Sequence, residues 1–144
     1  MKSISRDPIP YICEADRDLP QEEQTIFWVT PKNGQMAAAS TRRYYRVMDG
    51  SGDSQREYNE RKGLAADIEE FQSIVTKVEN FFFSAEYLQK RPNLDADENG
   101  AVKEIVDPNI FADLVRSELA SNVLQEIFGA ASDPVKLDRG AKKG

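Results

Sequence analysis

Histidine is absent from this chain and cysteine occurs only once, so several kinds of chemistry are excluded at the outset. Without an imidazole there is no Ser-His-Asp or Cys-His pair, no His-ligated zinc and no side chain that shuttles protons near neutral pH. A single cysteine also excludes a Cys-based zinc site, an iron–sulfur cluster and an intrachain disulfide. These absences argue against an enzyme, and we expect no metal and no cofactor.

Long apolar runs are also missing. No segment approaches the length of a membrane span, and the first eight residues lack the apolar stretch of a signal peptide. We therefore expect a location in a reducing cytoplasm and no membrane partner. Cys13, between Ile12 and Glu14, has no neighbouring base and is interpreted as a small, inert apolar residue.

Charge is unevenly distributed along the 144 residues. The 19 basic and 25 acidic side chains give a net charge of −6. Residues 92–135 carry −7, whereas the last nine residues, 136–144, carry +3. An acidic body disfavours non-specific binding to nucleic acid, so we expect no nucleic-acid partner. The basic and aromatic stretch 42–46 (RRYYR) is interpreted as a packed helix with arginines that reach to solvent.

The first 33 residues predict an extended arm and a short β-element. Pro8, Pro10 and Pro20 prevent one regular element over residues 1–24. Residues 25–30 (TIFWVT) are β-branched or aromatic and end at Pro31, which is typical of a strand. The arm at residues 11–13 is the nearby partner, so we expect two or three short strands.

Residues 34–129 predict a helical body of about three helices. A short helix is expected over 35–48, a mobile loop over 49–63 and an acidic loop over 92–106. Apolar residues at heptad spacing predict a long helix over 67–91 that Pro92 ends. Asp107-Pro108 opens the last helix, with Gly129 at its end, and 130–144 is expected to be a flexible basic tail. The fold class is therefore α+β and mostly α.

The acidic loop contains a partial calcium motif. Asp95, Asp97, Asn99 and Gly100 match positions 1, 3, 5 and 6 of an EF-hand loop, but position 12 is Val106 in place of the bidentate glutamate. The alternative is an acidic turn that joins two elements, for which Asp, Asn and Gly are the preferred residues. We assign no metal-binding residue here.

Three successive phenylalanines, at 81–83, point about 100° apart on a helix, so one core seam cannot bury them equally. Either this helix is buried on several sides or part of it meets another protein. The apolar stripes on 67–91 and 110–128 are suitable grooves for helical partners. The candidate partner-binding residues on them are Phe71, Val78, Phe81, Phe82, Phe83, Leu124 and Phe128.

Two parts of the chain resemble a known group of proteins. Residues 7–12 (DPIPYI), 15–20 (ADRDLP) and 22–27 (EEQTIF), with Thr30-Pro31 after them, resemble the opening of small proteins from tailed bacteriophages and prophages. Residues 118–127, which begin Glu-Leu-Ala, are similar to the ending of phage tail assembly chaperones. The stretch 34–106 carries no such resemblance.

The resemblance implies a non-enzymatic role in phage morphogenesis, in the cytoplasm of the bacterial host. Tail assembly chaperones bind the tape measure protein, keep it soluble and recruit tail tube subunits. Two alternatives stay open: a structural virion component of the tail or the head–tail joint, and a small inhibitor of a host system. Self-association is also left open.

Overall fold

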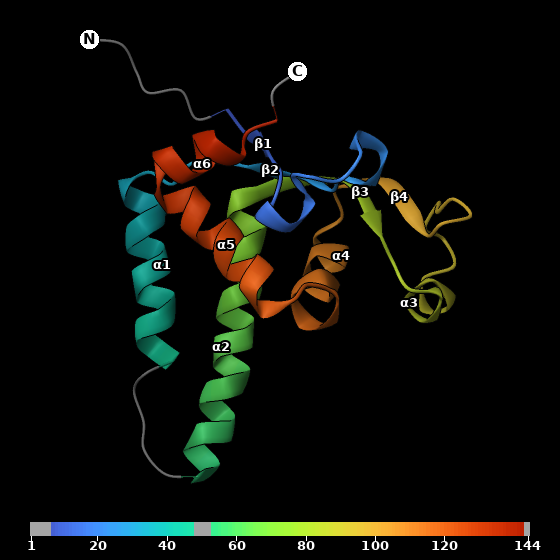
Figure 1. Cartoon of the computed structure of the whole chain (residues 1–144). Helices are drawn as coiled ribbons and strands as arrows, with labels where there is room; N and C mark the ends of the chain where they lie inside the picture. The colour runs from blue at the N-terminus through green and yellow to red at the C-terminus, as the bar shows by residue number, and fades with distance from the viewer. Residues whose placement is uncertain (1–6, 48–52, 143–144) are drawn as a thin grey trace.

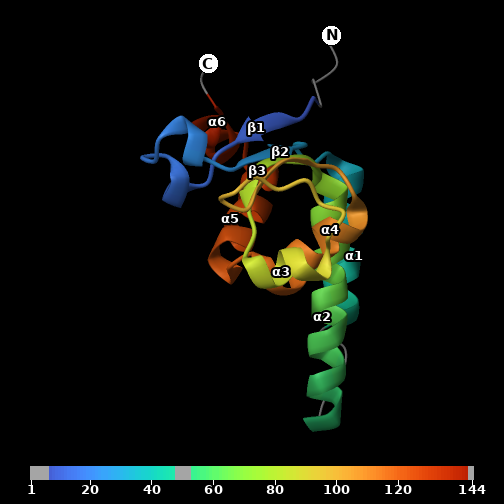
Figure 2. The same ribbon diagram turned by 90° about the vertical axis from the view of Figure 1, so that its right-hand side faces the viewer.

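The structure, a computed structural model, describes residues 7–47 and 53–142. The chain forms an α+β fold that is mostly α, as the sequence predicts. A four-stranded antiparallel sheet lies at one side of the molecule, with most of the helices below it in Figure 1. Figure 2 shows the same arrangement viewed from the right-hand side of Figure 1.

The sheet has the order β1-β2-β3-β4, so each strand pairs with the next one in the sequence. The strands are β1 (Ile9–Tyr11), β2 (Ile26–Val29), β3 (Val75–Phe82) and β4 (Ala101–Ile105). The predicted pairing of the arm with the aromatic strand is confirmed, with Tyr11 opposite Phe27. The expected two or three strands were too few, because β3 and β4 come from the predicted helical body.

The long helix predicted over 67–91 is wrong. Its first part is the end of α2 (Asp53–Ile74), and the chain then continues as β3 and, after Ser84, as the short helix α3 (Ala85–Lys90). Val75 and Thr76, two successive β-branched residues, mark the change from helix to strand. The strand is favoured because β2 and β4 pair with both of its edges.

The helix expected at 35–48 is confirmed as α1 (Gly34–Val47). The two loops expected at 49–63 and 92–106, in contrast, contain regular structure. Residues 53–63 of the expected mobile loop belong to α2, and 49–52 lie outside the described residues. The last part of the expected acidic loop, 101–105, is strand β4.

The last predicted helix, 107–128, is divided in two. Its N-cap is confirmed, because the Asp107 carboxylate accepts the Asn109 N–H at the start of α4 (Pro108–Asp113). A π-helical turn, Leu114–Glu118, follows, and the chain becomes extended at Leu119 before α5 (Ser121–Ser132). The expected end at Gly129 is wrong, since α5 runs past it.

The expected flexible tail is largely ordered. Residues 130–132 complete α5, and α6 (Pro134–Gly140) begins at the cap Asp133. The chain then runs beside β1: the Ile12 N–H donates to the Gly140 carbonyl at 2.8 Å, and the Lys142 N–H donates to the Pro10 carbonyl at 2.7 Å. The C-terminal segment therefore closes the β1 edge of the sheet (Figure 1).

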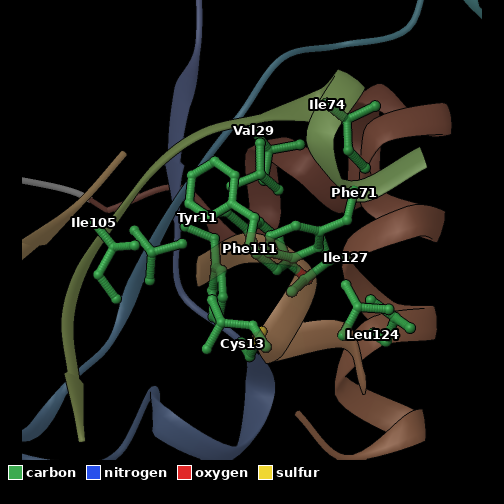
Figure 3. Packing of buried hydrophobic residues seen from close by; sticks show 14 of the residues in the cluster. Tyr11, Cys13, Val29, Phe71, Ile74, Ile105, Phe111, Leu124 and Ile127 are labelled. Carbon is green, nitrogen blue, oxygen red and sulfur yellow. The ribbon is translucent and has the colours of Figure 1, made fainter. Parts of the chain in front are cut away.

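The core lies between the sheet and helices α2, α4 and α5 (Figure 3). Phe71 of α2 is at its centre, with edge-on contacts to Phe27 of β2 and Phe111 of α4. The break after the π-helical turn lets Leu114 and Ile127, from consecutive helical segments, both reach this core. Within the described ranges, no helix is long and apolar enough to cross a membrane.

Candidate functional site

The predicted partner-binding residues do not share one surface. Four of the seven side chains are buried in the core, and the other three are partly or largely exposed. The buried four are Phe71, Val78, Phe83 and Leu124; the other three are Phe81, Phe82 and Phe128. Because 81–83 lie at the end of a strand, these rings have different surroundings: Phe83 stacks on Tyr87 at 4.5 Å, whereas Phe82 is 38% exposed.

The partial calcium motif is a turn held by hydrogen bonds from its backbone N–H groups to the Asp97 carboxylate. Asp97 Oδ1 accepts the N–H groups of Asn99 and Ala101 at 2.8 and 3.0 Å. Gly100 has φ +83°, and a Cβ there would lie 2.5 Å from the Phe83 carbonyl oxygen, so this position needs glycine. Among the described residues, no cluster of three or more cysteine, aspartate or glutamate side chains could hold a metal ion. The hydrogen bonds of Asp97 and the positive φ of Gly100 are those of an acidic turn, the alternative interpretation of this motif.

The arginine and tyrosine stretch on α1 faces α2. Arg43 Nη2 lies 3.3 Å from Glu70 Oε2, and the Tyr44 hydroxyl donates to Asp67 Oδ1 at 2.5 Å. Lys32 forms a second ion pair with Glu70, whose side chain is only 1% exposed. Burial and the bond to Asp67 raise the pKa of Tyr44 well above its ordinary value. Arg43 and Tyr44 therefore hold α1 to α2, whereas Arg42 is exposed.

Two other polar clusters fasten peripheral segments to the core. The Tyr11 hydroxyl donates to Glu126 of α5, and the Tyr87 hydroxyl donates to Asp113, which also pairs with Arg91. Burial and these carboxylates raise the pKa values of both tyrosines. Burial, with Glu126 nearby, raises the pKa of Cys13 too, in keeping with an inert thiol. The raised pKa values of Tyr11, Tyr87 and Cys13 therefore follow from burial and from the carboxylates near them.

Helices α1 and α2 form a hairpin that extends away from the sheet. Both Figure 1 and Figure 2 show the two helices side by side, with the far half of α2 beyond the rest of the molecule. Of the α1 side chains described, Met36 is the one packed against the core cluster. Ala37, Ala38, Thr41 and Arg42 are exposed on the outer side of α1. The hairpin therefore offers an open helical surface.

Strand β4 offers a second open surface. In the described part of the chain it is the last strand of the sheet, and two hollows lie along it. A hollow of about 600 Å³ runs beside residues 101–104, and another of about 410 Å³ runs beside residues 104–107. Asn93 and Leu94, in the loop after α3, line both. This edge could accept an extended segment.

Sequence reasoning missed the β4 edge, although a signal was present. Val102, Ile105 and Val106 are β-branched, which is typical of a strand, but Asp95, Asp97 and the residues after them predicted an acidic loop over 92–106. Comparison of this chain with protein-family models, with curated proteins and with solved structures finds no match. The two open surfaces are therefore the basis on which a function can be argued.

Proposed function

We propose that this protein is a non-enzymatic phage morphogenesis protein, a tail assembly chaperone that binds the tape measure protein and tail tube subunits. The resemblance of residues 7–31 and 118–127 to phage proteins supports the class of protein. The projecting α1–α2 hairpin is the single structural observation that supports the mode of action. A long helical partner requires a helical surface beside which it can lie.

Helix α1 suits such a partner because the side chains of Ala37, Ala38 and Arg42 are exposed on its outer side. Polar pairs hold α1 in place, chiefly Arg43 with Glu70 and Tyr44 with Asp67. The exposed Ala37 and Ala38 allow a second helix backbone to approach α1 closely, and Arg42 on the same side can meet an acidic residue. A helical segment of the tape measure protein would pack along this side of α1.

Co-expression with the tape measure protein of the same genome tests the proposal. We expect the tape measure protein to be soluble with the chaperone and to aggregate without it. Ala38→Glu places a charge on the proposed contact while it preserves helix propensity, so it should abolish this rescue. Ala85→Glu, at an exposed position of α3, is the matched control and should rescue as the native chain does. Equal solubility of the tape measure protein in all cases would remove the proposal.

Analysis of purified phage particles separates the two morphogenetic roles. A chaperone acts during assembly, so it should be absent from mature virions. Detection of the chain in mature particles, at a fixed ratio to tail proteins, would assign it to the virion structure instead.

A further inference from the structure

The two edges of the sheet are protected to different extents. At the β1 edge, backbone hydrogen bonds from Ile12 and Lys142 join the strand to the C-terminal segment. At the β4 edge, pairing within the described residues ends with the Ala96–Val102 bridge and the 3.0 Å bond from Asp97 N–H to the Ala101 carbonyl. On its outer side, the rest of β4 from Lys103 onward faces no strand among the residues that the structure describes. An open edge of this kind is a template for another extended chain.

The hollows beside this edge have apolar walls. Leu94 and Ile110 line the hollow beside Ile105 and Val106, and Val106 is itself 58% exposed. Ala96 and Val102 line the hollow beside Lys103. Together the two hollows run beside residues 101–107, that is β4 and the two residues after it, a length of about 20 Å at roughly 3.3 Å per residue. Residues 101 and 102 are already paired, so the open part, 103–106, fits about four residues of an added strand, and flanking residues of that segment can lie along the hollows.

A second copy of the chain suits the edge poorly in the registers centred on the charged residues of the strand. Two copies related by a two-fold axis would pair β4 with itself, so each residue near the axis would face its own counterpart. A register centred on Lys103 would bring two lysines together, and one centred on Glu104 would bring two glutamates together. Like charges directly opposite destabilise a sheet. A register shifted beyond Ile105 would place Pro108 in the pairing region, where it cannot donate a hydrogen bond.

The charge around the hollows favours a basic segment of another protein as the occupant. Four carboxylates line them, from Asp95, Asp97, Glu104 and Asp107, against the cations of Lys90, Lys103 and Arg91. Arg91 is already paired with Asp113 at 2.8 Å. The surroundings of the edge are therefore acidic, with apolar walls behind the charges.

We propose that the outer edge of β4, at residues 103–106, binds an extended segment of another protein in which apolar residues alternate with lysine or arginine. The segment would add a fifth strand to the sheet through main-chain hydrogen bonds. Its apolar side chains would occupy the hollows beside Leu94 and Ile110, and its basic side chains would meet Glu104 and Asp107. This proposal uses a surface separate from the α1–α2 hairpin, so it does not depend on the phage assignment.

The probe is a capped peptide with the sequence KVKIRVK, titrated into the full, isotopically labelled protein. Two control peptides have the same length: one carries N-methyl groups at alternate backbone amides, and the other has glutamate at every basic position. We expect the probe to bind with chemical-shift changes and slowed amide exchange centred on residues 103–106. Both controls should bind at least about tenfold more weakly, because one lacks backbone donors and the other has the wrong charge.

Matched variants locate the site. Val106→Lys removes apolar surface and adds a repulsive charge, so affinity for the probe should fall by about tenfold or more. Val135→Lys changes an equally exposed valine, 62% exposed on α6, and should leave affinity unchanged. Glu104→Lys should weaken binding in the same way, whereas Glu23→Lys, at an exposed position near β2, should not. Thermal unfolding of each variant checks that the fold is retained.

Several results would overturn the proposal. These are no binding of the probe at millimolar concentration, shift changes that map away from β4, or equal binding of the N-methylated peptide. Concentration-dependent protection of residues 103–106 without any peptide would show that a second copy occupies the edge instead. None of these results bears on solubility of the tape measure protein, so the two proposals can fail separately.

Discussion

The hydroxyl of Tyr11, in β1, donates a 2.7 Å hydrogen bond to Oε2 of Glu126, which lies 115 residues further along the chain in α5. The same carboxylate oxygen accepts the Glu14 N–H at 3.0 Å, and Arg17 donates to the Tyr11 hydroxyl at 3.2 Å. One carboxylate on α5 therefore anchors the N-terminal segment at Tyr11 and Glu14.

Removal of this anchor should destabilise the protein measurably. Tyr11→Phe deletes two hydrogen bonds in a partly buried position, the one to Glu126 and the one from Arg17, so the free energy of unfolding should fall by about 1–2 kcal/mol. Glu126→Ala also leaves the Tyr11 hydroxyl and the Glu14 N–H without their acceptor, and we expect a loss of about 2 kcal/mol. Gln125→Ala, exposed on the same helix, should stay within about 0.5 kcal/mol of the native chain. Urea denaturation measures all three, and an unchanged Tyr11→Phe would contradict the anchor.

Glu69 and Glu70 are adjacent in the sequence but have opposite surroundings. Glu70 is buried between Lys32 and Arg43, whereas the side chain of Glu69 is 64% exposed. Glu70→Ala leaves two cations without their shared carboxylate, and both can turn only partly toward water. We expect a loss of about 2–3 kcal/mol, while Glu69→Ala should cost less than about 0.5 kcal/mol. Equal unfolding midpoints for the two variants would show that the ion cluster does not hold α1.

Gly140 and Gly34 offer a second matched pair. A Cβ at Gly140 would overlap the ring of Tyr11, which hydrogen bonds hold in place. Gly140→Ala should therefore destabilise the protein by about 1–3 kcal/mol through overpacking. A Cβ at Gly34, the first residue of α1, meets no atom within 4 Å, so Gly34→Ala should be neutral or stabilising by up to about 1 kcal/mol. Thermal unfolding compares the two, and a neutral Gly140→Ala would mean that Tyr11 can move aside.

Alkaline pH should unfold the protein through its tyrosines. Burial, strengthened by hydrogen bonds to carboxylates, raises the pKa of Tyr11, Tyr44 and Tyr87 in the folded state. The unfolded chain releases these protons near pH 10, whereas the folded chain retains them. Their contribution to stability is therefore full below about pH 10 and falls as the pH rises further.

Nuclear magnetic resonance of tyrosine labelled at Cζ measures this directly, with each signal assigned by its Tyr→Phe variant. The three resonances should move to the phenolate position only when far-ultraviolet circular dichroism reports unfolding. Phenolate signals from Tyr11, Tyr44 or Tyr87 in protein that is still folded would contradict the prediction.

The sequence predicted some elements well because their signals are local. The aromatic strand around Phe27, the helix over 35–48 and the cap at Asp107-Pro108 need only a few neighbouring residues to be recognised. The same reasoning failed over 75–82, where the apolar spacing fits a helix seam as well as a buried strand. Hydrogen bonding to β2 and β4 decided in favour of the strand, and both partners are distant in the sequence.

By itself, the sequence determined the mostly helical α+β class, the excluded histidine and cysteine chemistry, and the concentration of negative charge in residues 92–135. Composition and short-range pattern are enough for those conclusions. Only the tertiary structure decided which apolar side chains remain accessible: it buries Phe71 and Val78 and leaves Val106 exposed. The physical reason is that exposure depends on which distant segment pairs or packs against each residue. The candidate binding surfaces, the hairpin and the β4 edge, therefore appear only once the chain is folded.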